Sequence, residues 1–248
     1  MDLNLNGKVA LVTGSTKGIG EEIASVLSSE DCKVVRNGRS NYDLKNDINN
    51  SIYLKGDLTN KQDAIDIGKG TIDHFGALDI LICNIGNGKS APPGSETIED
   101  WQQMINVNLF TTLNIINAAK SALSKSNGSI VCISSICGSE FIPGAPITYS
   151  VAKAALNAYI KSACRPLGEL GIKINGVAPG NINFSGSTWE AKIKKDPTGV
   201  NKMLKKEVAL QRLGSSREIA NLAAYLASPI SDFASGSIWT IDGGQVRS

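Results

Sequence analysis

A tyrosine and a lysine four residues apart have the spacing of an acid–base pair. Tyr149 and Lys153 lie in a segment of helical character, so their side chains share one face. A tyrosine ordinarily loses its proton at about pH 10, and acid–base work near neutrality needs about 4 kcal/mol of preference for the phenolate. A nearby ammonium in a partly dry site supplies about that much, so the pair predicts a phenol whose pKa Lys153 lowers. The alternative is an amphipathic helix with a chance pair.

The composition narrows the class of protein. The 248 residues are 42% hydrophobic and contain no linker or low-complexity run, which predicts a single domain over residues 1–248. The net charge is +2, the aromatic content is 5%, and no basic run occurs, so we expect a small-molecule substrate and neither nucleic acid nor membrane as partner. The N-terminus shows no signal-peptide pattern and no apolar run reaches about 18 residues, so we expect a cytoplasmic protein.

Cysteine and histidine usage argues against metal chemistry. The five cysteines form no Cys-x-x-Cys pair: Cys32, Cys83, Cys132, Cys137 and Cys164. We expect them to be reduced structural thiols. His74 is the only histidine, which excludes a histidine-rich metal site and leaves Ser-His-Asp catalysis without support. We therefore predict no metal site and place His74 at a helix end.

A short apolar run, residues 8–13, ends in a glycine-rich turn that leads into a helical pattern. The turn consists of Gly14, Ser15, Thr16, Lys17, Gly18, Ile19 and Gly20. Its glycines let the backbone approach a pyrophosphate, and the first turn of the following helix presents free N–H groups to it. The alternative is an ordinary βα loop, because the spacing G-x-x-x-G-x-G differs from the standard dinucleotide fingerprint.

The segment 13–20, together with Tyr149 and Lys153, resembles the short-chain dehydrogenase/reductase family. Further matching stretches recur over nearly the whole chain, at residues 75–86, 179–180 and 242–244. The resemblance implies a Rossmann-like, doubly wound parallel sheet of about seven strands in three α/β/α layers. It also implies an oxidoreductase that interconverts a secondary alcohol and a ketone by hydride transfer with NAD(P).

The resemblance assigns four catalytic residues. Ser135 would donate a hydrogen bond to the substrate carbonyl while Tyr149 supplies the proton. Lys153 would lower the pKa of Tyr149 and bind the nicotinamide ribose. Asn108 would be the fourth member, its backbone carbonyl holding a water at a local break in a helix. A capping or packing role is the alternative for Asn108, and Asn106 is a rival position.

The resemblance also implies cofactor contacts beyond the glycine turn and the Tyr149–Lys153 pair: Asp57, Leu58, Asn84, Gly86, Pro179, Gly180 and Ile182. Asp57 would accept a hydrogen bond from the adenine amino group, or cap a helix that begins near Lys61. The backbone of Ile182 would meet the nicotinamide carboxamide. Many relatives place a threonine two residues after this position, where the present chain has Phe184.

The end of the second strand predicts the cofactor. An acidic residue beside the adenosine ribose would favour a free 2′-hydroxyl, but the chain has Gly38 and Arg39 there, with Lys17 on the glycine turn. Two cations suit a 2′-phosphate, so we expect NADP(H) rather than NAD(H). The alternative is two solvated surface cations. Residues 41–51 are few for a connection between parallel strands, so we expect its helix to be a stub or absent.

Residues 183–208 correspond to the substrate lid of the family. They are rich in lysine, which forms either a solvated face or an attraction for an anionic substrate. The resemblance further implies a homotetramer, or a homodimer, formed through the helices around Asn108 and Tyr149. Two other functions stay open. One is a 3-oxoacyl carrier-protein reductase, against which Ser126 and Leu170 stand where docking arginines are expected. The other is a non-catalytic cofactor-binding regulator.

Overall fold

A seven-stranded parallel sheet forms the centre of the computed structural model, which describes residues 2–44 and 50–246. Its strand order is β3-β2-β1-β4-β5-β6-β9, and every neighbouring pair is parallel. The strands are β1 (Val9–Val12), β2 (Lys33–Gly38), β3 (Ser51–Lys55), β4 (Ile80–Cys83), β5 (Ser129–Ile133), β6 (Lys173–Pro179) and β9 (Ile238–Ile241). The order reverses between β1 and β4, which confirms the predicted doubly wound sheet.

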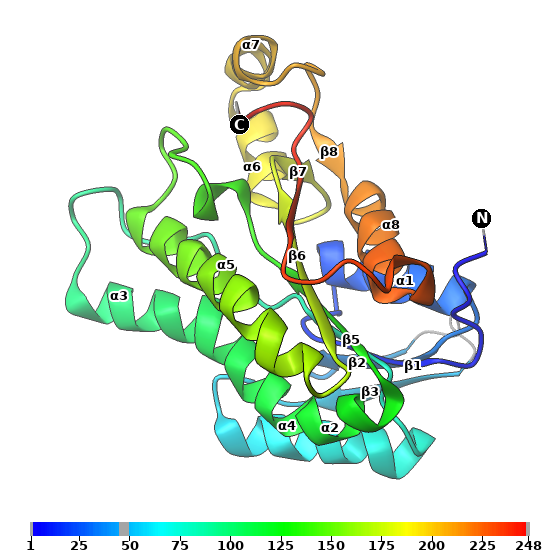
Figure 1. The fold of residues 1–248 in the computed structure, drawn as a ribbon. Coiled ribbons are helices and arrows are strands. Elements are labelled where there is room, and N and C mark those ends of the chain that lie inside the picture. The colour runs from blue at the N-terminus through cyan, green and yellow to red at the C-terminus, as the bar shows by residue number, and fades with distance from the viewer. Residues whose placement is uncertain (1, 45–49, 247–248) are drawn as a thin grey trace.

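Helices cover both faces of this sheet (Figure 1). One face carries α1 (Gly18–Ser29) and α8 (Ser216–Ala227), and the other carries α2 (Lys61–Phe75), α4 (Thr111–Ser126) and α5 (Ile147–Gly168). Alternate residues of each strand enter opposite cores, as Val34 packs with the α1 side and Val35 with the α2 side. Strands buried on both faces explain the continuous apolar runs of the sequence. The three-layer prediction is confirmed.

Several helix starts are fixed by side-chain caps. Thr97 and Asp100 form a capping box at the start of α3 (Ile98–Ile105), as expected from the sequence. At α2 the cap is Asn60, which accepts from the backbone N–H of Gln62. The capping role considered for Asp57 is therefore wrong, because its carboxylate accepts from the N–H and hydroxyl of Thr59 instead.

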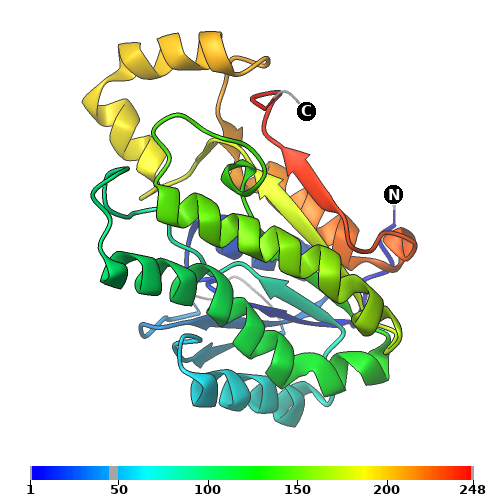
Figure 2. The same cartoon turned by 60° about the vertical axis from the view of Figure 1, so that its left-hand side comes forward.

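A second, two-stranded sheet was not predicted. β7 (Ile182–Asn183) pairs in parallel with β8 (Gly214–Ser215), and the 30 or so residues between them form α6 (Thr188–Lys195) and α7 (Pro197–Glu207). Figure 2 shows these two helices at the same end of the molecule as the start of α5. The paired strands hold both ends of the 184–213 segment to the body. That this segment acts as a lid stays a prediction.

The remaining connections and the surface add little to the site. Of the segment between β2 and β3, residues 45–49 lie outside the described residues, and the flanking residues 39–44 form no helix.

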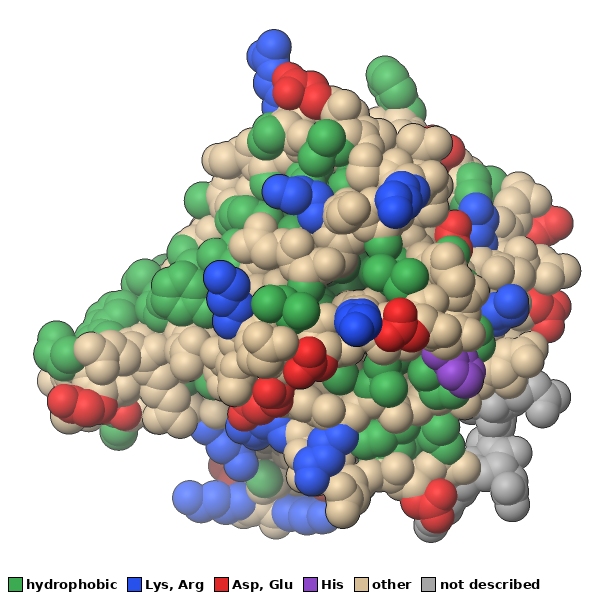
Figure 3. All heavy atoms as spheres, turned by 90° about the horizontal axis from the view of Figure 1, so that it is seen from below, with side chains coloured by type: hydrophobic (Ala, Val, Ile, Leu, Met, Phe, Trp, Pro, Cys, Tyr) green, Lys and Arg blue, Asp and Glu red, His purple; other side chains and the backbone are tan. Residues whose placement is uncertain are grey.

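Within the described ranges no helix is long and apolar enough to cross a membrane. On the face formed by α2 and α4, acidic and basic side chains are interspersed (Figure 3). This face therefore presents no single-sign patch of the kind that nucleic acid requires.

Candidate active site

Three predicted catalytic side chains converge where β5 ends. Ser135 follows β5 and caps the short helix η2 (Ile136–Gly138), its hydroxyl accepting from the N–H of Cys137 at 3.2 Å. Tyr149 lies in the first turn of α5, and its phenol interacts with the Ser135 side chain, which lowers the pKa of Tyr149. η2 packs directly on α5, since a Cβ on Gly138 would lie 2.6 Å from the backbone carbon of Lys153. This close packing holds Ser135 beside Tyr149.

Lys153 lies one helical turn below Tyr149 and is 2% exposed. Its ammonium donates to the carbonyl oxygen of Ile133 at 2.8 Å and lies 5.9 Å from the centre of the Tyr149 ring. A Cβ on Gly86 would lie 3.2 Å from the Lys153 Nζ, so glycine lets the loop after β4 approach the lysine. Burial lowers the pKa of Lys153 to about 8, because the charged form has lost its hydration.

The pKa of Tyr149 differs from the expectation. Burial raises it to about 12, and the hydrogen bond with Ser135 lowers it only in part. The Lys153 ammonium is directed to the Ile133 carbonyl rather than to the phenol oxygen. Loss of hydration therefore outweighs the attraction of a cation placed one turn away, and the protein's own groups keep Tyr149 protonated at neutral pH.

Asn108 is fully buried and fixes the loop that follows β4. Its side-chain oxygen accepts from the N–H of Asn87 at 2.9 Å, and its amide donates to the Asn87 carbonyl at 3.1 Å and to the Met104 carbonyl at 3.0 Å. It lies in a π-helical stretch, η1 (Asn106–Phe110), which is the local helix break expected here. The rival Asn106 instead lines a groove on the outside of the same helix.

The glycine turn is built for close backbone approach. Gly14 and Gly18 have φ of +61° and +63°, in the region that side chains disfavour. Asn84 ties the turn to β4, its amide donating to the carbonyls of Thr13 at 3.1 Å and Gly14 at 3.0 Å. A Cβ on Gly20 would clash with that amide.

The N-terminus of α1, which begins at Gly18 in this turn, has the backbone groups that a phosphate binds. Lys17 at the N-cap makes no side-chain hydrogen bond to the first turn of α1. Those N–H groups thus have no side-chain cap, and free N–H groups at a helix N-terminus are the kind that bind an anion. Ser15 is fully buried, and its hydroxyl donates to the Val12 carbonyl at 2.8 Å. The Ser15 side chain therefore fixes the backbone of the turn, and Thr16 and Ile19 are its remaining residues. The turn and helix end together match the shape and polarity of a dinucleotide pyrophosphate.

At the adenosine end, two of the predicted cofactor contacts face each other. Arg39 Nη1 lies 3.8 Å from Asp57 Oδ2, and the two side chains are 72% and 41% exposed. Gly38 ends β2 without a carboxylate, and Tyr53 donates to its carbonyl at 2.8 Å. The Leu58 side chain is buried, while its carbonyl accepts from Asn114 at 2.9 Å. Leu58 thus offers the site only its backbone.

The predicted nicotinamide contacts gather at the carboxyl end of β6. Pro179 is the last residue of β6, and Gly180 packs on Asp242, whose Cβ would lie 2.7 Å from a Cβ at the glycine. Ile182 is 7% exposed and belongs to β7. Pro179 thus ends the strand that pairs with β5, and Gly180 and Ile182 follow it at the same edge of the sheet as Ser135.

Two polar residues near the site escaped the sequence analysis. Arg36 is 3% exposed on β2, with Nη1 3.4 Å from the Ser15 carbonyl and no partner for its Nε. Asn157 on α5 accepts from the Ser134 hydroxyl and donates to Ser139. Arg36 interrupts the apolar run of β2, and Asn157 interrupts the apolar stripe of α5. That interruption is the signal that marks a buried polar residue.

Cys83, Cys132 and Cys137 lie near Lys153, and none of the five cysteines forms a disulfide. All five are free thiols, and Cys83 and Cys132 face each other in register across β4 and β5. Burial raises the pKa of the Cys83 thiol well above its ordinary value. No group of three or more histidine, cysteine or acidic side chains able to hold a metal ion occurs among residues 2–44 and 50–246.

Comparison with known proteins identifies the family. The family model described as enoyl-(acyl carrier protein) reductase matches residues 14–245. Glucose 1-dehydrogenase 2 of Bacillus subtilis is 30% identical over 253 residues, which cover 97% of this chain and 95% of the relative. The chain belongs to the short-chain dehydrogenase/reductase family. It is therefore an oxidoreductase that acts on CH–OH groups with NAD(P) as acceptor.

Other members of the short-chain dehydrogenase/reductase family match over the same length. The 3-oxoacyl-(acyl-carrier-protein) reductase of Vibrio cholerae is 31% identical over 249 residues, covering 98% of each chain. The ligand-free structure of aldohexose dehydrogenase from Thermoplasma acidophilum superposes with a TM-score of 0.88 at 27% identity, covering 100% of this chain and 98% of that one. The fold and the reaction class are thus shared across relatives with different substrates.

Proposed function

We propose that the protein is an NADP(H)-dependent reductase that converts a ketone into a secondary alcohol, with Tyr149 as proton donor. The observation that supports this most directly is that Tyr149 and Ser135 come together at the carboxyl edge of β5, one helical turn from the buried Lys153. Bound NADPH would supply the hydride. Two hydroxyl donors aimed at one carbonyl oxygen polarise the carbonyl and stabilise the negative charge that develops on it.

The pKa of Tyr149 suits reduction. At about 12 the phenol is protonated at neutral pH, which is the state a proton donor needs. Ser135 then donates to the carbonyl oxygen while Tyr149 transfers its proton there. Lys153 provides the positive charge beside the phenolate that forms, and Asn108 keeps the Asn87 loop in place around them. The proposed direction is therefore from ketone to alcohol.

We further propose NADP(H) over NAD(H). Gly38 leaves the end of β2 without an acidic side chain, and Lys17 and Arg39 both lie at this end of the glycine turn. Within residues 2–44 and 50–246, the ion pair of Arg39 is a long, exposed one with Asp57, so a 2′-phosphate competes for it at small cost. Two cations near one phosphate favour the phosphorylated cofactor.

A sugar or hydroxy-acid substrate is our first choice. Two relatives that match the full chain carry the names glucose 1-dehydrogenase and aldohexose dehydrogenase. The second candidate is a 3-oxoacyl carrier-protein reductase, which the Vibrio cholerae relative favours. Against it, Leu170 is exposed and takes a hydrogen bond from Ser124 on its carbonyl, next to Ser126 at the end of α4. This corner has no arginine at the two positions where docking arginines are expected.

The test is NADPH oxidation over a panel of keto sugars, 2-keto acids and β-ketoacyl thioesters. Tyr149→Phe should reduce kcat on the preferred substrate by about 10²- to 10⁴-fold, the usual contribution of a positioned acid. Tyr159→Phe removes a hydroxyl from the same helix, away from Ser135, and should leave kcat within about twofold. Unchanged activity in Tyr149→Phe would refute the proposed mechanism, and the ranking of the panel decides the substrate class.

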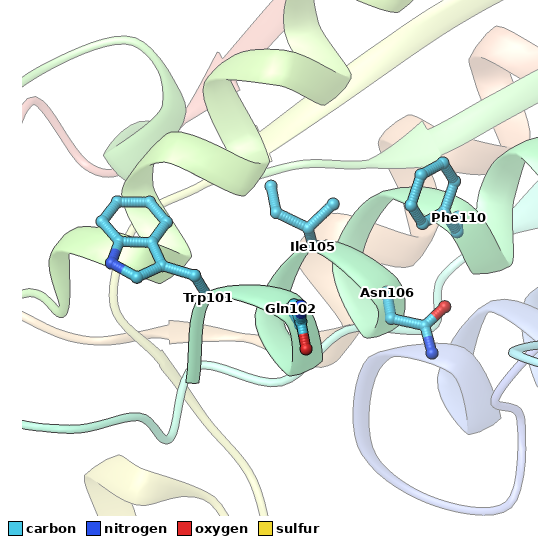
Figure 4. A pocket seen from close by; sticks show the side chains of 5 residues that line it. All are labelled: Trp101, Gln102, Ile105, Asn106 and Phe110. Carbon is cyan, nitrogen blue, oxygen red and sulfur yellow. The ribbon is translucent and has the colours of Figure 1, made fainter. Parts of the chain in front are cut away.

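We also propose a homotetramer or homodimer. A groove of about 420 Å³ lies on the outside of α3 and η1, lined by Trp101, Gln102, Ile105, Asn106 and Phe110. Figure 4 shows Trp101, Ile105 and Phe110 projecting to one side of this helix. Val151 on the neighbouring α5 is 43% exposed, which extends the apolar surface. Light scattering should give a multiple of the 26.1 kDa chain mass, and Val151→Glu should lower it.

A further inference from the structure

The ring of Phe184 lies directly on the glycine turn. A Cβ built on Gly18 would lie 2.6 Å from Cε2 of Phe184 and 2.9 Å from its Cδ2 and Cζ, so the ring is in contact with the glycine backbone. Phe184 is partly buried and, like Ile19, packs against the apolar cluster on the α1 side of the sheet. An aromatic side chain thus occupies the space in front of the second glycine of the turn.

This space adjoins the backbone N–H groups that a phosphate would approach. Gly18 is the first residue of α1, and the N–H groups of that first turn have no partners within the helix. They are the groups that bind a pyrophosphate at a helix N-terminus. A ring in contact with Gly18 and a phosphate that approaches the same backbone exclude each other sterically. A threonine at position 184 would lack the ring that contacts Gly18.

The backbone of Phe184 is also hydrogen-bonded to the start of α6. The N–H of Phe184 donates to the Ser187 hydroxyl at 3.3 Å, and the N–H of Ser187 donates to the Phe184 carbonyl at 3.0 Å. Ser187 is the N-cap of α6, accepting from the N–H of Glu190 at 3.0 Å. Immediately before Phe184, the chain is held by the pairing of Asn183 with Ser215. A displacement of the ring that shifts the Phe184 backbone would therefore move the start of α6, while the pairing of Asn183 holds β7.

We propose that Phe184 sets the affinity of the site for its dinucleotide. The ring covers the glycine turn, and the dinucleotide must displace it to reach the N–H groups of α1. The displacement costs binding free energy and moves α6, so that this helix responds to the cofactor. The inference rests on the proposed function of the turn as a binding site for the NADP(H) phosphates.

A ring that is not displaced by the dinucleotide would have the opposite effect on its affinity. A ring that stayed in place and packed against the bound dinucleotide would add contacts, and its removal would weaken binding. The sign of the change in affinity therefore separates the two arrangements.

The first experiment measures the Kd of NADP⁺ by isothermal titration calorimetry for wild type, Phe184→Ala and Phe184→Thr. Both variants should bind roughly three- to tenfold more tightly, as expected when one ordered side chain no longer has to be displaced. Phe233→Ala is the matched control, because Phe233 is fully exposed on the turn that follows α8, and its Kd should equal that of wild type. Thermal melting identifies a variant that has lost its fold, and the threonine variant keeps the test valid if alanine proves unstable.

The outcomes separate the inference from the proposed function. If wild type binds NADP⁺ and folded Phe184 variants bind it equally or more weakly, the inference is wrong and the proposed function stands. If wild type binds neither NADP⁺ nor NAD⁺, both are wrong.

The second experiment follows α6 through the emission of Trp189, which lies in its first turn. Saturating NADP⁺, which does not absorb in the range of tryptophan emission, should change the emission of wild type. The change should fall by more than half in Phe184→Ala and disappear in Trp189→Phe. An emission change in Phe184→Ala as large as in wild type would overturn the link between the ring and α6.

Discussion

The catalytic end and the adenosine end of the site are built in opposite ways. Ser135, Lys153 and Asn108 are each less than a tenth exposed, and their side chains hydrogen-bond to backbone groups. Arg39 and Asp57 are 72% and 41% exposed and meet across 3.8 Å. Chemistry thus depends on groups whose hydration has been removed, whereas cofactor choice depends on charges that remain in water.

This difference sets the size of the effects that substitutions should have. Removing water shifts the pKa of a buried group strongly, because its charged form has no other stabilisation. Exposed charges interact weakly and are screened by salt. Substitutions at the catalytic end should therefore alter stability and its pH dependence, and those at the adenosine end should alter only selectivity.

The largest effect is expected from Lys153→Met. The pKa of Lys153 in the folded protein is about 8, below its ordinary value of 10.5, so between these values the unfolded chain holds more protons. The contribution of this residue to stability therefore improves as the pH rises through that window. The free energy of unfolding of wild type minus that of Lys153→Met should rise by about 2–3 kcal/mol from about pH 7 to pH 10.

Urea denaturation of both proteins across this pH range makes the measurement. Taking the difference removes the contribution of the thiols and phenols that titrate in the same range. Parallel pH profiles for the two proteins would show that Lys153 is not held in a dehydrated environment.

A smaller effect is expected from Asn108→Ala. The substitution removes the hydrogen bonds that the buried Asn108 side chain makes to the backbone of the exposed Asn87, and it takes a partner from the carbonyl of the buried Met104. Stability should fall by about 2 kcal/mol, the cost of stranding buried polar groups. Asn106→Ala is the matched control two residues away, facing the outer groove, and should change stability by no more than about 0.5 kcal/mol. Equal losses would show that Asn108 does not hold the loop.

The smallest effect is expected from Arg39→Ala. The Kd of NADPH, measured by its fluorescence, should rise by about tenfold, as expected for one charge-assisted hydrogen bond made in water. The Kd of NADH should stay within about twofold, because it has no 2′-phosphate. Arg165→Ala, an exposed arginine at the far end of α5, serves as control. A loss of the same size for both cofactors would refute the role of Arg39.

Much of the architecture followed from local sequence patterns. Apolar runs, the glycine turn and the cap at Thr97 are determined by residues near one another in the chain, and each was found where expected. The convergence of Ser135 with Tyr149 followed from the family resemblance together with the rule that parallel strands end at one edge.

The misjudged features depend on contacts between distant segments. The direction of the Lys153 ammonium depends on a carbonyl of β5, and the pKa of Tyr149 depends on burial that no local pattern reports. The contact of Phe184 with Gly18 joins the two halves of the chain. The N-cap of α2 is Asn60 rather than Asp57, because the Asp57 carboxylate accepts a hydrogen bond from Thr59. Side-chain competition of this kind is decided only in the folded molecule.

The short pairing of β7 with β8 has a consequence for how this enzyme could diversify. Because both ends of residues 184–213 are fastened at one place, the chain between them forms a closed excursion whose removal leaves the main sheet intact. Such a segment can be exchanged as one unit between relatives, with the junctions at the paired residues of β7 and β8. The predicted role of this segment as a substrate lid implies that such an exchange would change which alcohols and ketones are accepted, while the reacting groups on α5 and after β5 stay the same.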